Sequence, residues 1–292
     1  MSDGRFIAID WGTTNRRAWL IERGQVLAAH RDDRGVRAMA SADYPAAIAE
    51  LRARFGDIRV LAAGMVGSSR GWREAPYVPC PAGAAELAAQ LLEVERDVWI
   101  VPGVSHLGEG RADVMRGEEV QLIGAVAAGL APHDGLLVQP GTHSKWAWMQ
   151  GGRIARFATA MTGELFDLLR RHSILAEMMR ETPDPDSDAF ALGVARGAAG
   201  ESLLHALFDV RAGTLLGLRD ASAGASLASG LLIGAEIAAH RADMAGGVHL
   251  LAEGPLAAAY ARAIALSVAT AHVVDSEAAF VAGISMIEEM RR

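Results

Sequence analysis

The sequence predicts a two-domain α/β protein, and three observations support this prediction. The chain of 292 residues is longer than one hydrophobic core usually organises, and 51% of its residues are hydrophobic, enough for two cores. Short apolar runs typical of strands alternate with longer helical patterns, as in layered α/β domains. One short element also occurs twice, once in each half. We therefore expect one domain at residues 1–133 and a second at 134–292.

The repeated element reads DWGTTNRRAW from Asp10 and QPGTHSKWAW from Gln139. Without a gap, the two copies share a Gly-Thr pair, a basic residue four positions after the glycine, and a closing Ala-Trp pair. Each copy follows an apolar run and leads into two more that are joined by a turn, so each predicts a strand, a polar loop and a β-meander. One such hairpin would be a common turn. Two aligned copies in matching surroundings indicate a duplicated domain, with a cleft between the copies.

The remaining elements of the first half alternate between helix and strand. Apolar spacing, turn residues and length decide between the two types. The expected elements are, in order, strands at 5–10, 17–22 and 25–31, a helix at 45–55, a strand at 58–64, a helix at 84–95, a strand at 97–103 and a helix at 118–130.

The second half is expected to contain more helix than the first. Its meander comprises strands at 135–140, 145–150 and 153–159. The later elements are helices at 163–172, 188–198, 201–208 and 227–241, a strand at 248–254, a helix at 255–267, a strand at 271–275 and a helix at 276–290. The last helix is free to pack back across the hinge onto the first domain.

Composition excludes several classes of protein. A formal net charge of -7 argues against a nucleic-acid partner, which would need a basic surface. The single cysteine, Cys80, rules out an internal disulfide and fits a reducing compartment. The N-terminus lacks the pattern of a signal peptide, and the apolar stretch 255–274 is interrupted by Tyr260 and Arg262, so we expect no membrane partner and a cytoplasmic location. The histidines form no zinc-binding pattern.

The two Gly-Thr loops have the groups that bind phosphate. Each offers backbone N–H groups, threonine hydroxyls and a nearby cation. Of the 28 basic residues in the chain, only Lys145 is a lysine, and it lies in the second copy. A bias toward arginine explains the scarcity of lysine but not this position, where a compact ammonium would suit a phosphate.

Three segments of the chain resemble segments of a known protein superfamily. FIAIDWGTTNRRAWL at 6–20 resembles the first phosphate loop of the actin, sugar kinase and Hsp70 superfamily, LLVQPGTHSKWAW at 136–148 takes the place of the second, and LLAEGPLAAAYARAI at 250–264 is similar to the adenosine segment. The resemblance implies two ribonuclease H-like domains, the actin-like ATPase fold, with nucleotide and substrate in the cleft. It also implies that Gly254, in the adenosine segment, contacts the nucleotide.

More narrowly, five segments in order along the chain resemble the 2-dehydro-3-deoxygalactonokinase family. They are AGMVGSSRGWREAPY at 63–77, VMRGEEVQLIGA at 114–125, PGTHSKW at 140–146, MTGEL at 161–165 and LASGLLIGAE at 227–236. The resemblance implies ATP-dependent phosphorylation of 2-dehydro-3-deoxy-D-galactonate at its 6-hydroxyl, a step of D-galactonate degradation.

Such a kinase needs ATP, Mg²⁺, a phosphate cradle and a base near the attacking hydroxyl. Asp10 ends the first strand just before the loop, where its carboxylate can hold the metal or its waters. The residues expected to bind the phosphates are Gly12, Thr13, Thr14, Asn15 and Arg16 or Arg17 in the first copy, and Gly141, Thr142, His143 and Lys145 in the second.

The general base is expected outside the second loop. Many relatives have an aspartate where this chain has Gln139, and an amide cannot accept the proton. Glu118, which follows a glycine at the start of a helix, is the first choice and resembles a catalytic glutamate of the exopolyphosphatase branch. Glu119 and Glu164 are the alternatives, and a pair of acidic residues in a first helical turn also favours the helix dipole without any catalytic role.

A keto acid carries a carboxylate, which a guanidinium recognises well. Arginines in loops of the first domain are therefore candidates for the substrate, together with a tryptophan wall and a hydroxyl partner. The candidate residues are Ser68, Arg70, Trp72, Arg73 and Arg116. The same arginines would also suit an ordinary solvated loop.

Other functions stay open at this point. A kinase for the epimer 2-keto-3-deoxygluconate would differ only in pocket geometry. A phosphatase of the exopolyphosphatase type would share the loops and the glutamate but use water. A non-catalytic nucleotide switch would need a further binding surface, for which 292 residues leave little chain. The partners expected are ATP and a small sugar acid, and a homodimer is compatible with the apolar helices.

Overall fold

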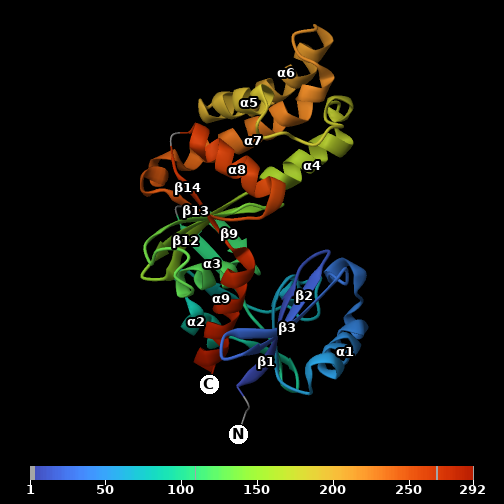
Figure 1. Ribbon diagram of the computed structural model, residues 1–292, viewed down its shortest axis with the longest axis vertical. Coiled ribbons are helices and arrows are strands. Elements are labelled where there is room, and N and C mark those ends of the chain that lie inside the picture. Colours follow the sequence, from blue (N-terminus) through green and yellow to red (C-terminus); the bar gives the residue numbers. More distant parts are fainter. Residues whose placement is uncertain (1–3, 109, 268, 292) are drawn as a thin grey trace. The chain divides into compact units, whose positions relative to one another are not determined.

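The structure is a computed structural model that describes residues 4–108, 110–267 and 269–291. The chain folds into two compact units (Figure 1). The first unit consists of Met1–Asp134, Ala147–Phe157 and Asp275–Arg292, and the second of Gly135–Trp146 and Ala158–Val274. The main chain leaves the first unit after Asp134, returns to it for Ala147–Phe157, and returns again for its last helix.

A six-stranded sheet in the order β3-β2-β1-β4-β7-β6 organises the first unit. β1, β2 and β3 form the predicted antiparallel meander, and β4 and β7 continue the sheet in parallel with β1. The strands are β1 Arg5–Trp11, β2 Arg16–Glu22, β3 Gln25–Asp32, β4 Val60–Gly64, β6 Leu92–Glu95 and β7 Val98–Ile100. Apolar side chains of β1, β4 and β7 pack with those of helix α1, Tyr44–Phe55, into one core.

Two further layers complete the first unit. Helix α3, Glu118–Ala127, packs along α9, Ser276–Arg291, so closely that a methyl group at Gly124 would lie 1.8 Å from the carbonyl oxygen of Ala279. A three-stranded sheet in the order β5-β8-β9 was not predicted; its strands are β5 Tyr77–Pro79, β8 Gly103–Gly108 and β9 Arg111–Met115. Short helical turns at Val36–Ala38 and Met65–Gly67 follow the meander and β4.

The helix predicted at 84–95 is wrong in its second half. Helix α2 covers only Ala84–Ala88, and β6 then forms an antiparallel hairpin with β7. Leu92 and Val94 pack against the core, while Glu93 and Glu95 are exposed, which is the two-residue period of a strand. Asp97, with φ of 58°, makes the turn of the hairpin.

The second unit is built on a five-stranded sheet in the order β12-β11-β10-β13-β14. A three-stranded meander followed by parallel strands is also the arrangement of the first sheet, so the repeated sequence element corresponds to a repeated topology. The strands are β10 Gly135–Gln139, β11 Ser144–Gln150, β12 Arg153–Ala160, β13 Val248–Leu251 and β14 Ala271–Val274. Residues Ala147–Phe157 of the β11–β12 hairpin belong to the first unit.

Helices make up most of the second unit. They are α4 Thr162–His172, α5 Asp188–Ala198, α6 Leu203–Leu215, α7 Gly224–His240 and α8 Gly254–Leu266. In Figure 1, α5 and α6 lie beside α7, which is the central helix of this group. Within the described residues, only the stretch Ala221–Gly246 is long and apolar enough to cross a membrane, and 67% of its apolar window is buried, as in the core helix of a globular unit.

Candidate active site

The first Gly-Thr loop, residues 12–15, connects β1 to β2 and is held from one side. Gly12 N–H donates to the carbonyl oxygen of Asn15 over 3.0 Å, which closes the turn. The N–H groups of residues 35–37 donate to the carbonyl oxygens of residues 12–14 over 3.0–3.2 Å. With those carbonyls engaged, the exposed residues 13–15 are left to offer hydroxyl, amide and N–H groups, the donors that phosphate oxygens accept.

Gly35 is a supporting residue of this loop that sequence reasoning missed. A methyl group there would lie 2.3 Å from the carbonyl carbon of Thr14, so any other residue would push the loop away. The only sequence signal was a glycine at the end of a polar run after the meander, and its partner lies 21 positions earlier in the chain.

The two arginines after the loop point to opposite faces of β2. Arg16 is fully buried, donates from Nε to Asp32 over 3.2 Å and makes a second, closer contact with the same carboxylate. Burial by itself would raise the pKa of Asp32. The hydrogen bonds from Arg16 and Arg34 and the charge of Arg16 outweigh burial and hold this pKa below its ordinary value. The guanidinium of Arg16 is paired with Asp32 inside the unit. Its environment therefore differs from the phosphate contact predicted for this residue.

Arg17 pairs with Asp10, the residue directly opposite it on β1. Its Nη2 lies 2.6 Å from Oδ2 of Asp10, and the two side chains are 24% and 17% exposed. Among the described residues, no group of three acidic, histidine or cysteine side chains gathers to form an all-protein metal site. A kinase Mg²⁺ usually takes one or two carboxylates and completes its shell with phosphate and water, so a single accessible carboxylate such as Asp10 fits that donor set.

Three segments of the first unit meet beside Asp10. A methyl group at Gly64, the end of β4, would lie 3.5 Å from Oδ1 of Asp10, and one at Gly117 would lie 3.0 Å from Cα of Gly64. Because β1 and β4 are parallel, both end at this edge of the sheet, and α3 begins there. The geometry brings the starting residue of α3, Glu118, to the same edge as Asp10.

Glu118 and Glu119 have different environments. Glu119 is fully buried, and both of its carboxylate oxygens accept from the N–H of Gly117, over 2.7 and 2.8 Å. Burial, aided by the charge of Glu118, raises the pKa of Glu119 to about 8. Glu118 is half-buried, and its Oε2 accepts from the N–H of Arg116 over 3.1 Å. Glu119 is thus occupied as a helix cap, whereas Glu118 keeps access to solvent.

Arg116 is a buried cation with two unused donors. Its side chain is only 8% exposed, its Nη2 donates to the carbonyl oxygen of Ala75 over 2.7 Å, and its guanidinium lies 4.3 Å from the ring centre of Tyr77. Nε and Nη1 are buried and have no hydrogen-bond partner among the residues that the structure describes. Burying such donors unpaired is unfavourable, so the arrangement fits a site whose anion is supplied by a ligand.

The other candidate substrate residues lie in the loop that follows β4. Ser68 Oγ donates to the carbonyl oxygen of Met65 over 2.7 Å and accepts from the N–H of Arg70 over 3.3 Å, so it holds the loop together. Trp72 stacks on Tyr44 at 5.5 Å between ring centres and packs against the core. Arg70 and Arg73 are exposed.

The second Gly-Thr loop, residues 140–143, leads from β10 into β11 and is held by the start of α4. A methyl group at Gly163 would lie 2.3 Å from the carbonyl oxygen of Gly141, and Glu164 N–H donates to Thr142 O over 2.9 Å. The sequence predicted Gly163 as the start of a helix but gave it no role in the site. The close approach explains why a glycine stands there.

Two side chains from outside the second loop contact His143 of that loop. The imidazole of His143 pairs with the carboxylate of Glu164, and both side chains are largely exposed. Lys145 is only 4% exposed and donates from Nζ to the carbonyl oxygen of His143 over 3.2 Å. The one lysine of the chain therefore lies beneath this loop rather than at its tip.

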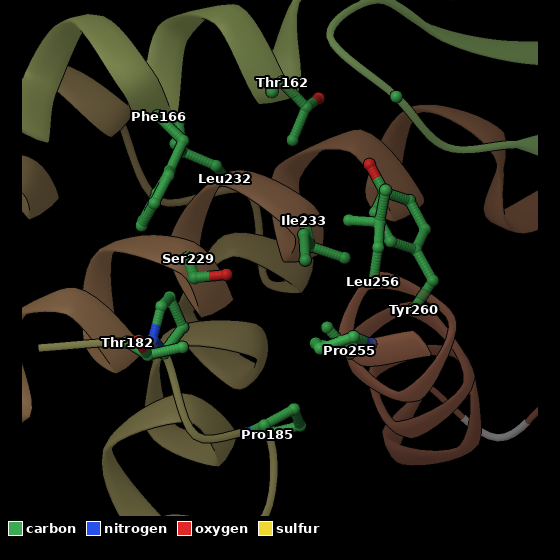
Figure 2. Close-up of a pocket in the computed structure, with 14 residues that line it drawn as sticks. Thr162, Phe166, Thr182, Pro185, Ser229, Leu232, Ile233, Pro255, Leu256 and Tyr260 are labelled. Carbon is green, nitrogen blue, oxygen red and sulfur yellow. The ribbon is translucent and has the colours of Figure 1, made fainter. Parts of the chain in front are cut away.

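A pocket of about 240 Å³ opens beside the second loop (Figure 2). It is small for a ligand pocket and mostly apolar, as suits a group the size of a nucleoside. Side chains from α4, α7 and α8 converge on it, and α8 begins at Gly254. The pocket is lined by Gly141, Thr162, Gly163, Phe166, Thr182, Pro183, Pro185, Ser229, Leu232, Ile233, Pro255, Leu256, Ala259 and Tyr260. The sequence predicted no site role for the pocket-lining residues of α4 and α7, which lie outside the adenosine segment.

Solved structures with similar topology define the class. The activator of 2-hydroxyisocaproyl-CoA dehydratase from Clostridium difficile, solved with ADPNP, aligns over 98% of this chain and 96% of its own with a TM-score of 0.50 at 12% identity. Component A of (R)-2-hydroxyglutaryl-CoA dehydratase from Acidaminococcus fermentans aligns over 99% of both chains with a TM-score of 0.51 at 12% identity. The chain thus has the actin-like ATPase fold, with two ribonuclease H-like domains, as the sequence predicted.

Closer relatives identify the family. The sequence model described as 2-keto-3-deoxy-galactonokinase matches residues 10–287. The 2-dehydro-3-deoxygalactonokinase of Escherichia coli is 39% identical over 287 residues, 97% of each chain. A Sinorhizobium meliloti crystal structure described as this kinase is 36% identical, with a TM-score of 0.91 over 97% of this chain and 98% of its own. The chain belongs to the 2-keto-3-deoxy-galactonokinase family and is a phosphotransferase.

Proposed function

We propose that the protein transfers the γ-phosphoryl group of ATP to the 6-hydroxyl of 2-dehydro-3-deoxy-D-galactonate, in D-galactonate degradation. The observation that carries the proposal is Arg116, a buried guanidinium whose Nε and Nη1 have no hydrogen-bond partner among the described residues. A carboxylate with two oxygens matches two such donors in both charge and geometry, whereas a neutral sugar group would match neither. Relatives with 36–39% identity that carry the name of this kinase support the choice of acid.

Phosphate binding is assigned to each of the two loops within its own unit. The hydroxyl and N–H groups of residues 12–15 and 141–143 bind phosphate oxygens, and the adenosine occupies the pocket at the start of α8, near Gly254 and Tyr260. Lys145 stabilises the second loop from beneath and adds positive charge there. We revise the role of Arg16 from phosphate contact to support of the first loop, because its guanidinium is paired with Asp32.

Mg²⁺ is assigned to Asp10, directly or through water. When bound, the ion neutralises charge that develops on the transferred phosphoryl group. Arg17 would then hold one oxygen of the Asp10 carboxylate and leave the other for the metal shell.

Glu118 is assigned as the general base. It accepts the proton of the substrate 6-hydroxyl as that oxygen forms a bond to the γ-phosphorus and the bond to the β-phosphate oxygen breaks, so ADP leaves. Its half-buried position at the start of α3 supports this choice over the fully buried Glu119. Glu164 is less suitable because its carboxylate pairs with His143.

The sugar acid is assigned to the loops around Arg116. Arg116 binds the carboxylate, Arg70 and Arg73 add positive charge at the exposed rim, and Ser68 and Trp72 shape the loop that carries them. The family match does not favour the two alternatives, a 2-keto-3-deoxygluconate kinase and an exopolyphosphatase-type phosphatase. As an ATP-dependent enzyme of sugar-acid metabolism, the protein is proposed to act in the cytoplasm.

We also propose a homodimer formed through α6. Leu204, Phe208 and Leu215 are 84%, 57% and 65% exposed and share one face of this helix, an apolar stripe of a kind that monomers seldom expose. If a second copy packs antiparallel on this face about a twofold axis, Leu204 meets Leu215 and the ring of Phe208 meets the guanidinium of Arg211. Phe208→Glu should then convert dimers to monomers in light scattering, and an unchanged mass would contradict this interface.

A coupled ADP-release assay tests the proposed reaction. Purified protein with Mg-ATP is given 2-dehydro-3-deoxy-D-galactonate, its gluconate epimer, galactonate or no sugar. Rapid release with the first alone supports the proposal and its stereochemistry. Rapid release with the epimer alone would transfer the assignment to that acid, and release without any acceptor would replace the kinase by a phosphatase.

A further inference from the structure

A carboxylate lies under the nucleoside pocket, and the reaction outlined above does not use it. Glu236, on α7, is 6% exposed. Its Oε1 accepts from the indole N–H of Trp146 over 2.6 Å, its Oε2 accepts from the hydroxyl of Tyr260 over 2.7 Å, and Thr162 Oγ1 makes a still closer contact with Oε2. The three partners come from β11, α8 and α4, so one side chain joins three separate elements.

Burying a carboxylate is unfavourable unless it is well hydrogen-bonded. The three donors to Glu236 are neutral, and burial raises the pKa of its carboxyl group while the hydrogen bonds from Thr162, Tyr260 and Trp146 act in the opposite direction. An apolar residue in place of Glu236 alone would leave the donors of Trp146, Thr162 and Tyr260 without this acceptor. The carboxylate and its partners therefore act as one network, and its role follows from what those partners do.

Two of those partners are walls of the pocket. Thr162 and Tyr260 both line it, and so do Leu232 and Ile233, which lie one helical turn before Glu236 on α7. Figure 2 shows Thr162 above Ile233 and Tyr260 beside it, and both hydroxyl groups contact the same oxygen of Glu236, Oε2. One carboxylate therefore holds the hydroxyl groups of two residues that line the pocket.

The third partner belongs to the strand that leaves the phosphate loop. Trp146 follows Lys145 on β11, and Ser144, the first residue of that strand, shares a 2.8 Å hydrogen bond with the hydroxyl of Tyr260. The hydrogen bonds of Glu236 and Tyr260 thus run from the pocket wall to the strand that anchors residues 141–143. A shift of either side would be transmitted to the other.

We propose that Glu236 is a positioning residue for the nucleotide, which holds the nucleoside pocket and the second phosphate loop in one fixed arrangement. The inference rests on the proposed function for the identity of the nucleotide as ATP. It assigns no contact between Glu236 and substrate. Its effect on ATP is exerted through Thr162, Tyr260 and β11.

The first test is Glu236→Gln, which keeps the size of the side chain but leaves fewer acceptors for the three donors. We expect KM for ATP and the dissociation constant for ADP, measured by calorimetry without acceptor, to rise together by about 10- to 100-fold. KM for the sugar acid should stay within about twofold. Glu236→Asp, which keeps the charge, should recover part of the loss.

A milder variant covers the case in which Glu236→Gln does not fold. Tyr260→Phe keeps the ring and the pocket wall and removes one donor to the carboxylate, so a rise of severalfold in the ADP dissociation constant is expected. Where both single variants fold, the double variant should lose less than the product of the two single effects. Independent, multiplicative losses would overturn the shared network.

A second buried carboxylate serves as the matched control. Glu288, on α9 of the first unit, is 1% exposed and pairs with Arg59 at 3.0 Å. Glu288→Gln should lower the melting temperature and leave ADP binding unchanged. If Glu236→Gln is folded and binds ADP as the parent does, or if it behaves like the control, the proposal fails. Because ADP binding needs no acceptor, the proposal can survive even if no sugar acid is phosphorylated.

Discussion

Replacing Arg116 with methionine separates the binding of the sugar-acid carboxylate from the stability of the fold. Methionine has a similar length and no charge, so it fills the space of the arginine stem. Nε and Nη1 have no partner in the described structure, and each can donate a charge-assisted hydrogen bond to a bound carboxylate. At about 1.5–3 kcal/mol for each bond, the variant should lose about 3–6 kcal/mol of transition-state binding, or roughly 10²- to 10⁴-fold in kcat/KM.

The same substitution should have a small effect on folding. It removes the hydrogen bond from Nη2 to Ala75 and the contact with Tyr77, together about 2–4 kcal/mol. It also removes two buried donors that have no partner among the described residues, each unfavourable by about 1–3 kcal/mol. The two effects nearly cancel, so the melting temperature should change by only a few degrees.

The assay compares the natural acid with a neutral analogue that has a hydroxymethyl group in place of the carboxylate. The parent enzyme should prefer the acid strongly, and Arg116→Met should lose that preference while its activity on the neutral analogue stays nearly constant. Arg116→Lys, which keeps the charge but not the fork, should fall between them. An equal loss on both substrates would refute a carboxylate contact and point to damage of the loop instead.

Three further predictions concern charged residues near the two loops. Glu118→Gln should lower kcat by about two to four orders of magnitude with ADP affinity intact, and near-normal turnover would move the base elsewhere. Lys145→Ala should raise KM for ATP and slow turnover, whereas unchanged kinetics would exclude a phosphate-loop role. The pKa of Glu119 is raised to about 8 from an ordinary 4.5, so the folded state holds its proton more tightly than the unfolded state. The free energy of unfolding should therefore fall by a few kcal/mol as pH rises from about 4.5 to 8, and denaturant titrations of Glu119→Gln should lack that decline.

Much of the architecture could be predicted because the decisive signals are local. The two meanders follow from short apolar runs around Gly-Thr loops, and the repeated element shows that the plan occurs twice. The failure at 84–95 has a physical cause. Alanine-rich sequence at 84–91 favours a helix, but the two-residue period at 92–95 and the turn at Asp97 add an edge strand to the sheet, and that tertiary pairing prevails over local propensity.

The candidate site was harder to predict because its residues are distinguished by distant partners. Arg16 and Arg17 are adjacent in sequence, yet one is buried against Asp32 and the other pairs with Asp10. Strand alternation separates their faces, but only the register of β1 against β2 shows that Asp10 lies opposite Arg17. Likewise, the sequence does not distinguish Glu118 from Glu119. The structure does, because the N–H of Gly117 donates to the carboxylate of Glu119.

The return of α9 to the first unit affects the order in which the chain can fold during synthesis. Helix α3, which starts at Glu118, has nearly all of its residues buried and packs along α9, which is synthesised only after the second unit. Until then, the apolar face of α3 lacks its covering helix, so the edge that holds Glu118 and Asp10 stays incomplete. A prematurely terminated chain should therefore lack the assembled catalytic edge even when all of the residues proposed for it have been made, and a fragment that ends at Asp134 should expose the face that α9 normally covers.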